Sequence, residues 1–172
     1  MLRIIFFIAG FISSGYLWAD EGRTELAGVY KYLDQKMGSN DFFGISAKRE
    51  ITPGFYVGLE VVFPSDAYNN NGREGFAMKE HGGLVLAFRS FIAENLYYEL
   101  SLTGGIAMGE SVETSGDVSG ICDCTYGFVE PNIHLLYQVT PTLGIGGLIG
   151  ELRIFSENEN ANVYGLEVAA KF

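Results

Sequence analysis

The sequence has few basic residues, one tryptophan and two cysteines, and each scarcity narrows what the chain can be. Eleven Lys and Arg residues stand against 21 Asp and Glu residues, which gives a formal net charge of -10. Phosphate neutralisation needs clustered basic side chains, so this balance argues against a nucleic-acid partner. Outside the N-terminus, no window places apolar residues at helical spacing, and no linker is visible. We expect a single domain without amphipathic helices.

The N-terminal segment has the features of a secretory signal peptide. Arg3 supplies the positive start, residues 4–11 form an apolar run, and residues 17–19 (Leu-Trp-Ala) form a small-residue cleavage site. Small polar residues interrupt the apolar part, which falls short of the roughly 20 residues that a spanning helix needs. The alternative of an uncleaved anchor is therefore less favoured. We expect a signal peptide over residues 1–19 and one domain over residues 20–172.

Period-two alternation of apolar and polar residues recurs along the mature chain in segments of about ten residues. Three of the connections between these segments are tight turns, and the other four, residues 34–41, 64–80, 109–124 and 155–162, are long and polar. Short turns at one rim and long loops at the other predict an all-β fold, an eight-stranded antiparallel up-and-down transmembrane β-barrel with both termini periplasmic. The expected strands are residues 24–33, 42–51, 55–63, 81–91, 96–108, 125–139, 143–154 and 163–172.

The two faces of the expected strands differ in a way that indicates which one meets lipid. In residues 96–108, large apolar side chains such as Leu100 and Leu102 share one face, and Glu99 lies on the other. A soluble barrel of the lipocalin kind would bury the large set, whereas a membrane barrel turns it outward. The alternation of apolar and polar residues is irregular in residues 143–154. We expect the side chains of Glu151 and Arg153 to point inward or to lie at the outer rim. Pro131 suggests a bulge.

The inward face collects ionic side chains. An eight-stranded barrel is just wide enough for side chains to fill it, so we expect these groups to pair in a hydrogen-bonded plug. A narrow, gated solute or ion channel is the alternative. The expected lumen network is Lys31, Lys48, Glu60, Arg89, Glu99, Glu130, His134 and Glu167.

The last expected strand carries the most specific motif. Its apolar face, which ends in the C-terminal residue, consists of Tyr164, Leu166, Val168, Ala170 and Phe172. This stripe resembles the assembly signal of bacterial outer-membrane proteins, and the whole plan resembles the eight-stranded OmpA/OmpX/opacity-protein superfamily. The resemblance implies a Gram-negative outer membrane, with lipid and lipopolysaccharide as neighbours and insertion by the barrel-assembly machinery.

No catalytic pair is evident. Small barrels that modify lipid A place a serine and a histidine at the rim, but neither His81 nor His134 is followed by serine two residues on. Ser90 and Ser101 have no evident partner. We therefore expect no enzyme, and a lipid A-modifying enzyme is the less favoured alternative.

The two cysteines, Cys122 and Cys124, lie in the third long connection, where a tight disulfide and two separate thiols are both open. Two thiolates and the intervening aspartate lack the further ligands of a closed metal site. We expect neither a metal nor a cofactor.

The long connections are acidic. They carry eleven Asp and Glu residues against three Lys and Arg residues, a difference of eight negative charges. Such charge keeps a surface soluble, and it also suits divalent-cation bridging to lipopolysaccharide phosphates or a basic external partner. We expect a structural or surface-interaction protein whose recognition, with an extracellular ligand left open, lies in these loops.

Overall fold

The computed structural model describes residues 24–34, 40–65, 75–115, 118–155 and 159–172. The signal peptide expected at residues 1–19 lies outside them and stays a prediction. Among the described residues, no helix is long and apolar enough to cross a membrane. The strands are β1 (Thr24–Asp34), β2 (Asp41–Thr52), β3 (Phe55–Pro64), β4 (Gly75–Ala93), β5 (Leu96–Ser115), β6 (Val118–Thr140), β7 (Leu143–Ile154) and β8 (Glu159–Lys171).

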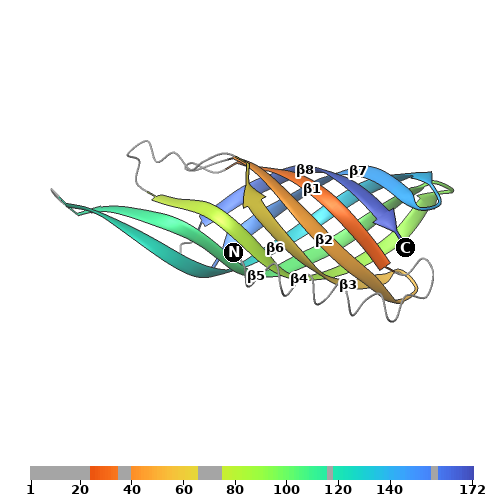
Figure 1. Ribbon diagram of the computed structural model, residues 1–172, viewed down its shortest axis with the longest axis horizontal. Helices are drawn as coiled ribbons and strands as arrows, with labels where there is room; N and C mark the ends of the chain where they lie inside the picture. Colours follow the sequence, from red (N-terminus) through yellow and green to blue (C-terminus); the bar gives the residue numbers. More distant parts are fainter. Residues whose placement is uncertain (1–23, 35–39, 66–74, 116–117, 156–158) are drawn as a thin grey trace.

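The eight strands close into one barrel in sequence order (Figure 1). Every neighbouring pair is antiparallel, and β1 pairs with β8 from Glu25↔Lys171 to Asp34↔Asn162. Closure matters because an open edge would leave unpaired N–H and C=O groups on the sheet. The predicted fold class is confirmed.

The tight turns lie where the sequence predicts them. Hairpin pairs Thr52↔Phe55, Ala93↔Leu96 and Thr140↔Leu143 close β2–β3, β4–β5 and β6–β7. In the first turn Gly54 has φ +81°, a conformation that L side chains rarely adopt, and its N–H donates to Glu50 Oε1 at 2.8 Å. The three turns define one end of the barrel, called here the turn end; the opposite end is the loop end.

The prediction of a third long loop over residues 109–124 is wrong for most of that range. β5 and β6 stay paired as far as Ser115↔Val118, and their hairpin reaches beyond the other strands at the loop end (Figure 1). β4 likewise begins earlier than expected, at Gly75. Backbone pairing alone can hold such an extension, so the sequence needs no apolar alternation there and gave no sign of it.

The outward face is apolar. Leu84, Leu166 and Ile133 are 62%, 64% and 53% exposed, while Glu99 and Glu130 on the inward face are both 0% exposed. The large side chains therefore point away from the barrel axis, which excludes the lipocalin-like polarity. On β7, Glu151 and Arg153 lie on the outward side near the loop end and pair with each other at 2.8 Å.

Pro131 does not mark a bulge. The pairs Val129↔Arg153 and Asn132↔Gly150 on either side of it keep one register. Proline lacks only the N–H, so it can occupy this position without shifting the strand.

Candidate functional site

In the described part of the chain, every buried charged side chain lies in the barrel interior. These side chains and some buried polar neighbours form two clusters. The turn-side cluster lies nearer the short turns, and the loop-side cluster lies nearer the long connections. The turn-side cluster consists of Glu25, Lys48, Arg89, Glu99, Ser101, His134 and Glu167. The loop-side cluster consists of Lys31, Glu60, His81, Glu130 and Asn132.

Arg89 on β4 organises the turn-side cluster. Its Nη1 and Nη2 donate to the two carboxylate oxygens of Glu25, both at 2.8 Å, while its Nε donates to Glu99 at 3.0 Å. The guanidinium also lies between two tyrosine rings, 4.5 Å from the Tyr56 centroid and 4.4 Å from that of Tyr97. This forked, stacked arrangement uses the planarity of arginine, which a lysine would not reproduce.

Lys48 on β2 joins the same carboxylates to a third one. Its Nζ lies 2.7 Å from Glu99, 3.2 Å from Glu25 and 3.3 Å from Glu167. Glu25 lies on β1 and Glu167 on β8, so Lys48 links the first and last strands through the interior as well as through their backbone ladder.

The same cluster contains a chain of hydrogen bonds from Ser101 through His134 to Glu167. Ser101 Oγ is 2.9 Å from His134 Nε2, and His134 Nδ1 is 2.7 Å from Glu167 Oε2. The expectation that Ser101 has no partner is therefore wrong, because β5 and β6 bring it beside a histidine 33 residues away in sequence.

This chain repeats the order nucleophile, base and orienting carboxylate, but its surroundings differ from those of a catalytic serine. Ser101 is only 8% exposed, and it pairs with Ala87 on one side and Asn132 on the other. A residue in mid-sheet has its backbone N–H directed along the ladder, so it presents no oxyanion donor to a substrate. We interpret this chain of hydrogen bonds as one that holds interior side chains in fixed positions.

In the loop-side cluster, Lys31 on β1 bridges two carboxylates. Its Nζ lies 2.5 Å from Glu60 Oε1 on β3 and 2.6 Å from Glu130 Oε1 on β6. Asn132 Nδ2 also donates to Glu130 Oε1, at 2.8 Å. Glu130 Oε2 and both ring nitrogens of His81 are buried without a hydrogen-bond partner.

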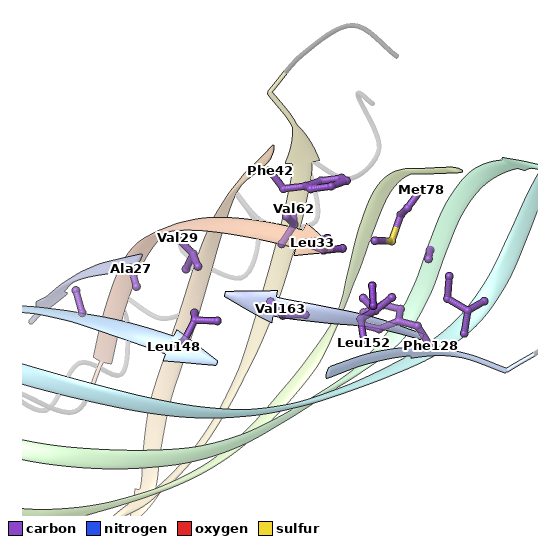
Figure 2. Packing of buried hydrophobic residues seen from close by; sticks show 14 residues of the cluster. Ala27, Val29, Leu33, Phe42, Val62, Met78, Phe128, Leu148, Leu152 and Val163 are labelled. Atoms are coloured by element: carbon purple, nitrogen blue, oxygen red, sulfur yellow. The ribbon is translucent and has the colours of Figure 1, made fainter. Parts of the chain in front are cut away.

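Apolar side chains close the interior at the loop end. Leu33, Phe42, Val62 and Ile154 are buried and lie within two residues of the loop-side ends of their strands. Figure 2 shows the side chains of this core pointing inward from several strands. The His81 ring lies against Phe42 and Phe128 at centroid distances of 5.9 and 5.2 Å. The interior is thus filled by apolar, ionic and aromatic layers in turn.

The structure brings all eight residues of the expected lumen network into the barrel interior. It adds Glu25, His81, Ser101 and Asn132, which the sequence analysis did not include. The alternation of faces along each strand could have identified two of these residues. Glu25 lies on the same face of β1 as Lys31, and His81 lies on the same face of β4 as Arg89.

The cysteine prediction is tested only at one of its two residues. Cys124 is disulfide-bonded. The side chain of Cys122 lies outside the described part, so their mutual pairing stays a prediction.

Three of the solved structures similar to this chain share its barrel fold. The N-terminal β-barrel domain of Pseudomonas aeruginosa OprF matches with a TM-score of 0.57 and 14% identity, over 88% of this chain and 98% of that one. Neisserial surface protein A matches with a TM-score of 0.58 and 13% identity, over 87% and 96%. The Yersinia pestis attachment invasion locus protein Ail, solved with the heparin analogue sucrose octasulfate, matches with 0.56 and 11%, over 89% and 100%.

The chain has the fold of the eight-stranded outer-membrane β-barrels. No family model and no curated sequence matches it. The outer-membrane barrel fold is thus reached here by a sequence of low identity to these three structures. At identities of 11–14%, the likeness shows the fold alone.

Proposed function

We propose that the protein is an integral outer-membrane barrel with a structural or surface-interaction role, its loop end at the cell surface and its termini in the periplasm. The filled interior supports this role most directly. Ion pairs, the Tyr56–Arg89–Tyr97 stack and the apolar side chains at the loop end occupy the interior in successive layers. A solute would have to break buried ion pairs to pass, and breaking such a pair costs about 3–5 kcal/mol.

Conductance across a planar bilayer tests the plugged interior. We expect the refolded wild-type protein to give no discrete openings. Discrete, reproducible openings whose size changes in Glu130→Gln or Arg89→Ala would establish a narrow channel and refute the structural role. Heat-modifiable gel migration of each sample checks that the barrel is folded before it is measured.

The acidic loops favour a cationic partner. The Ail structure holds a polysulfated ligand, but the loops of this chain carry eight more negative than positive charges, which would repel such a ligand. We propose that the loop end binds a basic surface or bridges to lipopolysaccharide phosphates through divalent cations.

Protein in vesicles with and without lipopolysaccharide, titrated with an oligolysine peptide and with sucrose octasulfate, separates these partners. Peptide binding that weakens with salt supports a basic partner. Lipopolysaccharide retention that EDTA abolishes supports cation bridging. Preferential binding of the sulfated sugar would contradict both.

The C-terminal strand supports recognition by an insertion machinery. Tyr164, Leu166, Val168 and Phe172 are 49%, 64%, 53% and 57% exposed on the outer face, and Ala170 shares their parity. We propose that this stripe is read by the barrel-assembly machinery before β8 joins β1.

The enzyme alternative is tested at Ser101. An enclosed serine without an oxyanion site should not react with a fluorophosphonate probe, and lipid A should keep all its acyl chains when the protein is expressed. Labelling of wild type but not of Ser101→Ala, or a change in acyl number, would reverse this reading.

A further inference from the structure

The loop-side cluster contains an arrangement of ligand atoms that its protein contacts leave incomplete. One ligand atom each from Glu60, His81 and Glu130 lie within 4.8 Å of one another, and all three residues are buried. They come from β3, β4 and β6, so the cluster spans the interior rather than following one strand.

Three of the four unpartnered side-chain atoms of the loop-side cluster belong to two of these residues, and the fourth is Asn132 Oδ1. Neither nitrogen of His81 has a hydrogen-bond partner, although the residue is only 3% exposed, and Glu130 Oε2 is also unpartnered at 0% exposure. Leaving a buried polar group unpaired costs about 1–3 kcal/mol, and more if it is charged. These buried atoms therefore need a partner that the protein itself does not supply.

The separation of these atoms suits coordination better than hydrogen bonding. His81 Nε2 and Glu130 Oε2 are 3.5 Å apart, which is long for a hydrogen bond. Two ligands of a tetrahedral ion with bonds near 2.1 Å stand roughly 3.4 Å apart. The observed distance of 3.5 Å is close to this separation between two ligands.

The other oxygen of Glu130 is already fixed by its neighbours. Lys31 Nζ and Asn132 Nδ2 both donate to Oε1, at 2.6 and 2.8 Å, which orients the carboxylate and leaves Oε2 toward His81. Such outer contacts orient metal ligands in known sites. Phe42 and Phe128 hold the imidazole ring from its sides.

The net charge of the buried side chains also favours a bound cation. The buried charged residues comprise five glutamates, two lysines and one arginine, a net charge of −2 when both buried histidines are neutral. In the loop-side cluster itself, Glu60 and Glu130 against Lys31 leave a net charge of −1, which favours a cation there.

We propose that Glu60, His81 and Glu130 bind a divalent transition metal of the zinc class, which cross-links β3, β4 and β6 inside the barrel. One imidazole nitrogen and two carboxylates are ligands that zinc accepts, whereas Ca²⁺ requires six to eight oxygens. Because apolar side chains close the loop end, the ion enters while the barrel folds and then stays.

Metal content after refolding tests the site. The mature chain is refolded from denaturant into detergent with Zn²⁺ or with EDTA, and the folded fraction is washed with chelator and assayed by mass spectrometry. We expect about one zinc per barrel, a higher temperature for the heat-modifiable transition with zinc than with EDTA, and a visible d–d absorption band when Co²⁺ replaces zinc.

Two matched variants locate the metal. His81→Phe keeps an aromatic ring between Phe42 and Phe128 and should lose the bound zinc. His134→Phe removes the other buried histidine and should retain it. Glu60→Gln provides a second loss variant, and gel migration shows that each protein is folded.

Two outcomes would overturn the proposal. Folded wild-type protein without zinc would show that the cluster is stable without a metal. Equal zinc in wild type and His81→Phe would place the metal on the acidic loops. Neither result bears on whether the protein is a plugged outer-membrane barrel.

Discussion

Replacing Arg89 with Met removes the central cation of the turn-side cluster at similar side-chain length. The change deletes two 2.8 Å bonds to Glu25 and the contacts to Glu99. Breaking one side of a buried ion pair costs about 3–5 kcal/mol, because the remaining charge stays buried. Lys48 still contacts both glutamates, at 3.2 and 2.7 Å, so we expect the lower limit, about 3 kcal/mol.

Urea unfolding of the refolded barrel measures this loss. With a slope of about 2 kcal/mol per molar urea, a loss of about 3 kcal/mol lowers the midpoint by roughly 1.5 M. Tyrosine fluorescence is a suitable probe, since the only tryptophan is Trp18, in the expected signal peptide. The fraction with folded gel mobility provides a second one.

The matched control is Arg153→Met, the same chemical change in a pair whose side chains are 56% and 34% exposed. An exposed ion pair contributes little to stability, so this variant should shift the midpoint far less. Adding Glu25→Gln to Arg89→Met should recover at least about 1 kcal/mol, because it removes the unpaired charge. Equal shifts for the two arginine variants would refute the argument that the buried cluster depends on charge pairing.

Four further substitutions probe the wall and the C-terminus. Leu102→Arg, on the outward face, should lower the free energy of unfolding in lipid vesicles by about 2–4 kcal/mol, and no loss would mean that this face does not meet acyl chains. Gly58→Ala should cost about 1–3 kcal/mol, because its new Cβ would lie 2.2 Å from a backbone oxygen of Ala47. Gly28→Ala, with nothing within 4 Å, should change stability by less than about 0.5 kcal/mol in the same urea assay. Phe172→Ala should reduce the folded fraction in outer membranes of growing cells while leaving the urea midpoint of refolded protein nearly unchanged, and equal effects in both assays would argue against an assembly signal.

The fold was predictable because a membrane barrel imposes period-two alternation on every strand, and tight turns fix which strands are neighbours. The length of the β5–β6 hairpin was not, since backbone pairing beyond the barrel wall leaves no mark on the pattern of apolar residues.

The interior was predictable in membership but not in pairing. Parity along a strand places Lys31 and Glu130 inside, yet nothing in the sequence shows that two residues 99 positions apart are in contact across the barrel. That pairing depends on how far each strand is staggered against the next around the barrel. Ser101 and His134 lie diagonally on the neighbouring strands β5 and β6, and the sequence analysis predicted His134 in the interior but not its contact with Ser101.

The seam between β1 and β8 has a consequence for how the protein is made. Its register joins residues from opposite ends of the mature chain, so no part of the chain that lacks its last strand can complete the ring. Synthesis runs from the N-terminus, so it must be complete before the final ladder can form. Until then the chain exposes an unpaired strand edge and apolar side chains, which favour aggregation in water.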